Sequence, residues 1–369
     1  MQSKRRKANI ELLRIIAMSG VIFLHYFNPT IGGGIEYVNN GSINECCLKI
    51  LEAINIPAVN LFIMISGYFL CKSNKRSIGR GLSLLIQVIL INLLFYIAKA
   101  FLGKIEVCFD TILQAILPVN WFMILYVVLY IISPLINFAY CGLPDNVQHN
   151  NPRFLNKRTT LVGLFTIFSV LTTVVDILAQ TTGNEFKGLS PLGMYGSERG
   201  YTLVQFVLCY IIGAFISYSD INKIKKRYCL LIWITSTLIV FLWSYWDTYT
   251  SYEYCNPMNI VSATAILTLF LKIEIQNEKA EKFITTLSGC ALTVYLIHNY
   301  LITHVGIEKY VNEMLPIMLI HILAVTAAII LISFVLDKVY KLVMKKPISK
   351  LSSLWSYSIK DDIHSLTDT

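Results

Sequence analysis

The chain has 369 residues, of which 55% are hydrophobic and only 14% are charged, and its mean hydropathy is +0.61. This composition excludes an ordinary water-soluble domain and favours the lipid bilayer as the surrounding solvent. The formal net charge of +9 does not indicate nucleic-acid binding, because the basic residues are divided among short segments and do not form one soluble face.

Apolar stretches of roughly the 20 residues that a spanning helix needs recur along the chain. The first stretch lacks a small-residue cleavage site, so we do not expect it to be removed as a signal peptide. We predict an all-α polytopic membrane protein of about ten transmembrane helices. The predicted spans are residues 9–28, 53–71, 82–102, 120–140, 159–180, 201–219, 229–246, 257–272, 284–304 and 314–338.

Lys and Arg residues are concentrated in every second connection, which marks these connections as cytoplasmic. The basic connections are residues 1–8, 72–81, 141–158, 220–228, 272–283 and 338–369. The alternate, outer connections are residues 29–52, 103–119, 181–200, 247–256 and 305–313. Their only Lys and Arg residues are Lys49, Lys104, Lys187, Arg199 and Lys309.

This asymmetry predicts that both termini are cytoplasmic and that the protein is multi-pass in the inner (cytoplasmic) membrane. The outer connections are candidates to cover the mouth of a site. We expect a single transmembrane domain over residues 1–346 and a polar cytoplasmic tail over 347–369.

The first span carries three polar residues, Glu11, Arg14 and His25. An Arg near mid-membrane costs about 2.5–3.5 kcal/mol on insertion scales. At about 100° per residue, Arg14 and His25 lie within about 20° of one helix face, some 16 Å apart along the axis. Glu11 is placed to pair with Arg14. A snorkelling Arg14 and a hydrogen-bonded packing His25 are the structural alternatives, but their common face favours a functional pathway across the membrane.

The first span also carries a family motif. Its sequence, from Asn9 through Glu11 and Arg14 to His25, resembles the opening of the acyltransferase-3 membrane family, which has Arg-x10-His in its first helix. The similarity extends over residues 9–304. Further matches are Pro57, Asn60-Leu61-Phe62, Ile65-Ser66-Gly67-Tyr68, Trp121-Phe122, Tyr126, Tyr130, Pro134, Ser288 and Tyr295-Leu296-Ile297-His298.

This resemblance implies transfer of an acyl group, usually acetyl from acetyl-CoA, to a hydroxyl of a carbohydrate or related envelope molecule. The expected partners are then acyl-CoA as co-substrate, a carbohydrate or lipid-linked glycan acceptor and the bilayer, with no permanently bound cofactor. His25 would be the general base on the acceptor hydroxyl, and an acyl-His intermediate is the competing mechanism. Arg14, held by Glu11, would orient the donor.

A polyanionic donor such as CoA calls for a basic mouth on the cytoplasmic side. Lys72, Lys75, Arg76 and Arg80 meet this requirement, and we predict that Lys75, Arg76 and Arg80 bind the donor. The family commonly has Arg-x-x-Arg before its third helix, whereas this chain has Arg76-x-x-x-Arg80. The alternative is a positive-inside loop that binds no ligand.

Four further residues are candidates to line the same cavity: His298, Tyr295, Trp121 and Ser66. Tyr295 precedes His298 by about one helical turn. Structural roles are the alternative. A lone His among apolar helices is more often a packing residue, and Trp or Tyr often anchors a helix at the membrane–water interface. Sugar stacking is the functional alternative for Trp121.

Two other classes of function stay open. A transporter or flippase of a lipid-linked glycan would use Arg14 and His25 as a substrate or proton pathway. A membrane sensor or assembly partner would need neither residue. The nine cysteines have no metal-ligand spacing, so we predict no metal site.

Overall fold

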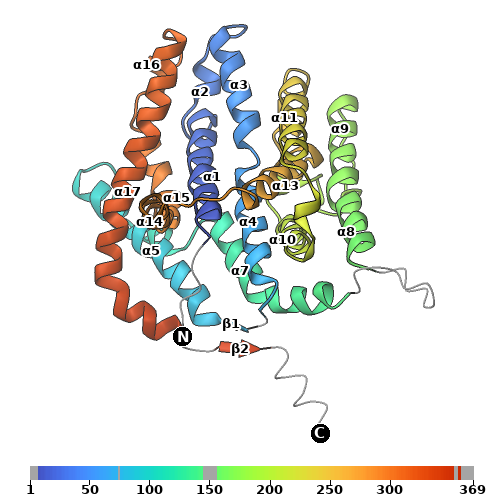
Figure 1. Ribbon diagram of the computed structural model, residues 1–369. Helices are drawn as coiled ribbons and strands as arrows, with labels where there is room; N and C mark the ends of the chain where they lie inside the picture. The colour runs from blue at the N-terminus through green and yellow to red at the C-terminus, as the bar shows by residue number, and fades with distance from the viewer. Residues whose placement is uncertain (1–6, 74, 144–155, 353–355, 359–369) are drawn as a thin grey trace, which may run out of the picture.

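The computed structural model describes residues 7–73, 75–143, 156–352 and 356–358, and shows a bundle of helices (Figure 1). The first-half elements are α1 (Ala8–Phe27), α2 (Gly34–Tyr37), α3 (Ile43–Asn55), α4 (Ala58–Leu70), β1 (Lys75–Ser77), α5 (Ile78–Phe101), α6 (Phe109–Ile116), α7 (Trp121–Ile136), η1 (Asn137–Cys141), α8 (Lys157–Phe165), η2 (Thr166–Leu171) and α9 (Thr172–Thr182). The second-half elements are η3 (Glu198–Gly200), α10 (Leu203–Tyr218), η4 (Ile221–Lys223), α11 (Lys226–Trp243), α12 (Thr248–Ser251), α13 (Pro257–Leu271), α14 (Glu278–Ser288), α15 (Ala291–Ile302), α16 (Ile307–Tyr310), α17 (Leu315–Ser352) and β2 (Ser356–Ser358).

The prediction of an all-α membrane protein is confirmed. Within the described residues, seven helical segments are long and apolar enough to cross a bilayer. They are Ala8–Phe27, Ile43–Leu70, Ile78–Phe101, Trp121–Cys141, Lys157–Thr182, Lys226–Trp243 and Leu315–Met344.

The other three predicted spans coincide with shorter apolar helices, α10, α13 and α15. The longest, α10, has 16 residues. At about 1.5 Å per residue it is shorter than a hydrocarbon layer of about 30 Å. The exact number of crossings and the side of each terminus therefore stay predictions.

Two predicted boundaries differ from the structure. The outer connection expected at 29–52 contains α2 and α3, and α3 continues almost directly into α4. The two helices separate at Pro57, which has no N–H to continue the hydrogen-bond ladder. The expected span at 284–304 is likewise two helices, α14 and α15, which separate at Gly289 and Cys290.

The first helix lies at the centre of the bundle. Along its length α1 contacts α3, α4, α13, α14, α15 and α17. Its apolar side chains Ile10, Leu13, Ile22 and Phe27 are at most 1% exposed. Among the polar residues of α1, Glu11 is buried and Arg14 and His25 are partly buried, and such residues in a membrane protein mostly face the bundle interior.

A second close contact joins α4 to α10 at two glycines. A Cβ on Gly67 would collide with the backbone oxygen of Tyr210, and one on Gly213 with that of Met64. Small residues at such a crossing let two backbones approach closely. Helix α10 also contacts α7, and α4 also contacts α1.

The two strands lie at the end of the bundle opposite α2 and α16 (Figure 1). They pair antiparallel, with Lys75 opposite Ser358 and Ser77 opposite Ser356. Helix α17 continues past Pro347, where the polar tail was predicted to begin, and ends at Ser352. Residues 353–355 and 359–369 of that tail lie outside the described residues.

Candidate active site

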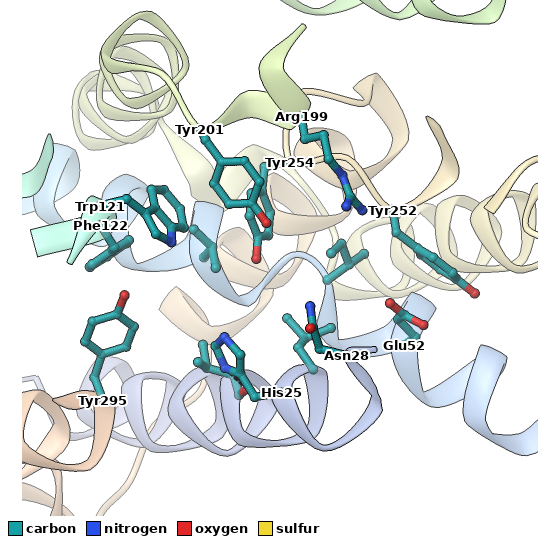
Figure 2. Close-up of a pocket in the computed structure, with 14 residues that line it drawn as sticks. His25, Asn28, Glu52, Trp121, Phe122, Arg199, Tyr201, Tyr252, Tyr254 and Tyr295 are labelled. Atoms are coloured by element: carbon teal, nitrogen blue, oxygen red, sulfur yellow. Dashed lines mark hydrogen bonds between the residues drawn. The ribbon is translucent and has the colours of Figure 1, made fainter. Parts of the chain in front are cut away.

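A pocket lies where the C-terminal end of α1 meets the segments that follow α9 and α12 (Figure 2). Several of these segments belong to the connections predicted to be outer. The pocket is lined by Val21, Leu24, His25, Asn28, Glu52, Ile56, Val59, Trp121, Phe122, Arg199, Tyr201, Tyr252, Tyr254 and Tyr295.

Two histidines meet at this pocket. His25 points into it from α1 (Figure 2), and its Nδ1 lies 2.7 Å from Nε2 of His298 on α15. His298 is only 1% exposed, and its Nδ1 lies 3.2 Å from the carbonyl oxygen of Val294. The Nδ1 of His25 also lies 3.0 Å from the carbonyl oxygen of Val21. Of the sequence candidates, His25 and His298 are thus brought into direct contact.

These contacts assign the hydrogen atoms of the pair. A carbonyl oxygen only accepts hydrogen bonds, so Nδ1 of a neutral His298 carries the hydrogen and its Nε2 accepts. Nδ1 of His25 then carries a hydrogen and donates it to Nε2 of His298. The Val21 carbonyl oxygen also lies within hydrogen-bond distance of this Nδ1. A neutral His25 therefore keeps its lone pair on Nε2. This is the arrangement that a general base or a nucleophile needs.

Aromatic side chains form one wall of the pocket. Trp121 stacks on Tyr254, with ring centroids 6.1 Å apart and an interplanar angle of 24°. Tyr201 meets the edge of Trp121 at 4.4 Å. Tyr295 lies on the opposite side beside His25 (Figure 2), and its hydroxyl donates to Oδ1 of Asn120 at 3.1 Å. Flat amphipathic surfaces of this kind suit a ring that has both apolar and polar edges.

Glu11 and Arg14 form a separate polar cluster nearer the start of α1. Nη1 of Arg14 lies 2.7 Å from Oε1 of Glu11, as the sequence spacing predicts. Ser288 of α14 donates to the other carboxylate oxygen at 2.6 Å. The Arg14 side chain is 30% exposed whereas that of Glu11 is 5% exposed. The guanidinium is therefore accessible from outside the cluster.

The predicted donor-binding residues do not share one environment. Arg76 is 3% exposed, and its guanidinium donates to the hydroxyl of Ser133 and to the backbone oxygens of Leu70, Ser73 and Lys75. These bonds use four of the five donors of an Arg side chain. The side chains of Lys75 and Arg80 are exposed.

Ser66 lies outside the pocket lining. Its hydroxyl donates to the carbonyl oxygen of Phe62 at 3.0 Å and lies 3.2 Å from the hydroxyl of Tyr126. Trp121 and Tyr295, in contrast, line the pocket beside His25. Three of the four predicted cavity residues therefore lie at or against the pocket, and Ser66 packs between α4 and α7.

Sequence reasoning did not select two charged residues of the pocket, Arg199 and Glu52. The sequence marked Arg199 only as the single Arg in the predicted outer connections, and it did not mark Glu52. Arg199 has φ 53° and ψ 17° and follows Glu198 at φ 51°. Left-handed backbone at non-Gly residues costs on the order of 1–3 kcal/mol each and concentrates at ligand sites.

The described residues contain no group of three or more His, Cys, Asp or Glu side chains placed to hold a metal ion.

Comparison with known proteins identifies the family. The model of the acyltransferase-3 family, described as an acyltransferase domain, matches residues 7–338. The match includes the histidine pair, the Glu11 cluster and the whole pocket lining. No curated protein and no solved structure matched the chain. The transporter or flippase alternative gains no support from the family match. The chain belongs to the acyltransferase-3 family and is a membrane acyltransferase.

Proposed function

We propose that the protein is an O-acyltransferase of the inner membrane that moves an acetyl group from acetyl-CoA to a hydroxyl of a cell-surface or lipid-linked carbohydrate. The observation that carries this proposal is the pocket-facing His25, whose Nδ1 contact with His298 leaves Nε2 to act as a base. The aromatic wall beside it supports a carbohydrate as the acceptor.

In the proposed reaction Nε2 of His25 removes the proton of the acceptor hydroxyl. The hydroxyl oxygen attacks the thioester carbonyl, a C–O bond forms and the C–S bond to CoA breaks. The departing thiolate then takes the proton from His25. His298 accepts the Nδ1 hydrogen bond throughout and stabilises the positive charge that His25 carries between the two proton transfers.

An acyl-His intermediate is the second form of this mechanism. The same nitrogen would attack the thioester, release CoA and pass the acyl group to the acceptor. The two forms differ in one observable, because only the second leaves an acyl group on His25 when acetyl-CoA is supplied without an acceptor. Mass spectrometry of the peptide that contains His25 distinguishes them.

The donor is proposed to enter from the side of the membrane that carries Arg14, Lys75 and Arg80. The partly exposed Arg14 would orient the donor, with Glu11 holding its guanidinium. The exposed Lys75 and Arg80 are placed to meet phosphate groups. Arg76, with its internal hydrogen bonds, is proposed to shape the loop that carries them.

The test is chemical analysis of surface glycans from cells with the intact protein, without it, with His25→Ala and with the control His304→Ala. His304 is exposed, and within the described part of the chain its side chain contacts only the neighbouring Thr303 and Tyr300. We expect ester-linked acetyl on the glycan with the intact and control proteins and its loss in the other two strains. Unchanged acyl content in all strains, with the glycan present, contradicts the proposal.

A further inference from the structure

The pocket contains an arginine, Arg199, that forms no ion pair within the described residues. Arg199 lies on the far side of the pocket from His25, with its guanidinium pointing into the pocket (Figure 2). Its buried Nε has no hydrogen-bond partner. Among the described residues, no carboxylate oxygen lies within 4.0 Å of a guanidinium nitrogen of Arg199. The planar fork of N–H donors is therefore left to bind a ligand.

The backbone holds this side chain in place. Glu198, Arg199 and Gly200 have φ values of 51°, 53° and 80° in succession. The carbonyl oxygen of Arg199 accepts from the N–H of Tyr254 at 3.0 Å, and its own N–H donates to Oγ of Ser197 at 3.1 Å. A non-Gly residue keeps a left-handed backbone conformation only where the surrounding structure holds it there. The backbone of Arg199 is therefore held in a fixed position beside the pocket.

The neighbours of Arg199 include no hydrogen-bond acceptor for its guanidinium within the described residues. Tyr249 covers one face of the guanidinium, with its ring centroid 5.0 Å from Cζ. Glu52 also lines the pocket, but it forms no ion pair with Arg199, and its carboxylate is left to accept hydrogen bonds from hydroxyls. The aromatic wall of Trp121 and Tyr254 completes the surface.

A ligand that satisfies all of these groups has a sugar ring with hydroxyls and an oxyanion. We propose that Arg199 binds a carboxylate or phosphate oxyanion of the acceptor glycan and thereby makes the enzyme selective for anionic acceptors. This inference rests on the proposed function, because it takes the pocket as the acceptor site. A guanidinium pairs with either oxyanion through two parallel N–H bonds.

The test measures binding to the purified full-length protein in lipid nanodiscs by tryptophan emission. Trp121 lines the pocket, and Trp121→Phe identifies its part of the signal. The probes are methyl β-glucuronoside, glucose 1-phosphate and the neutral methyl β-glucoside. The first two distinguish a uronate acceptor from a sugar-phosphate acceptor. The variants are Arg199→Gln, Arg199→Lys and the matched control Lys187→Gln, whose lysine lies in the same connection and is 55% exposed.

We expect the intact protein to bind at least one charged probe about tenfold or more tightly than the neutral probe. Arg199→Gln should abolish this preference, Arg199→Lys should keep part of it, and Lys187→Gln should keep all of it. Size-exclusion profiles and melting temperatures show whether each variant folds. The inference is overturned if the intact protein lacks an anion preference or binds no probe, if folded Arg199→Gln retains the preference, or if Lys187→Gln loses it equally.

The same preparations separate this inference from the proposed function. CoA release from acetyl-CoA is measured with the intact protein and with His25→Ala. If release depends on His25 and the anion preference is absent, the assignment of Arg199 fails and the proposed function stands. If the anion preference depends on Arg199 and release is independent of His25, the proposed function fails and the oxyanion site stands.

Discussion

Nε2 of His298 lies 2.7 Å from Nδ1 of His25, although the two residues are 273 positions apart in the chain. The contact joins α15 to the central helix and fixes which nitrogen of His25 faces the pocket. The outer hydrogen-bond partners of metal-bound His residues typically contribute 10–100-fold, and we expect a similar contribution from the partner of a catalytic His. His298 is thus a positioning residue for the proposed base.

We predict that His298→Ala lowers kcat about 10–100-fold and leaves the KM for acetyl-CoA nearly unchanged. His25→Ala should lower kcat about 10²–10⁴-fold, and the double variant should be no worse than His25→Ala, because the two residues act as a unit. Steady-state CoA release measures these values, with His304→Ala as the control. A kcat within twofold of the intact protein for His298→Ala contradicts the positioning role.

The sequence located the polar residues that lie inside apolar spans. His25, His298 and Arg14 are conspicuous there because a bilayer makes such residues costly. The link between Glu11 and Arg14 followed from helical spacing alone. The link between His25 and His298 did not, because it depends on how α1 and α15 pack together.

The half of the pocket that connecting segments form was not predictable in the same way. Arg199, Tyr252 and Tyr254 lie in connecting segments, where no periodicity relates a residue to its neighbours in space. Glu52 was expected in a loop and instead lies on α3. Helix bounds also shifted where a local feature ended a helix, as Pro57 does between α3 and α4.

The Glu11 cluster yields a prediction about stability. Arg14→Gln leaves the Glu11 carboxylate, which is 5% exposed, with the Ser288 hydroxyl as its one partner among the described residues. Removing the partner of a buried charge costs about 3–5 kcal/mol, and the partial exposure of Arg14 puts this case near the lower end. Glu11→Gln removes the charge but keeps an acceptor for Ser288, so it should cost only about 1 kcal/mol. Thermal unfolding in nanodiscs measures both, and a lower Tm for Glu11→Gln than for Arg14→Gln contradicts the argument.

The crossing of α4 and α10 yields a second stability prediction. A Cβ at Gly67 or Gly213 would lie against backbone oxygen of the facing helix, so each Ala variant must separate the two helices. Overpacking of this kind costs roughly 1–3 kcal/mol. Gly163 in α8 is the matched control, because a Cβ there meets nothing within 4 Å, and Ala should raise helix stability by up to about 1 kcal/mol. Equal Tm values for the three variants would show that the helices do not pack at these glycines.

Glu253 provides a pH-dependent prediction outside the spanning segments. It is 0% exposed in the segment between α12 and α13, and burial, with a smaller effect of the Asp176 carboxylate, raises the pKa of Glu253 from 4.5 to about 9. Between these values the unfolded chain has released this proton and the folded chain retains it. Stability therefore falls as pH rises through this window, by at most about 1.4 kcal/mol per pH unit from this group.

Glu253→Gln should remove this contribution, because the amide keeps the shape of the protonated carboxyl and does not titrate. We expect Tm of the intact protein in nanodiscs to decline between pH 5 and 9 more steeply than Tm of Glu253→Gln. Glu185→Gln is the control and should follow the intact protein, since the Glu185 side chain is 72% exposed. Parallel Tm curves for the intact protein and Glu253→Gln would contradict the prediction. They would mean that Glu253 is ionised in the folded state, where a buried carboxylate needs a positively charged partner.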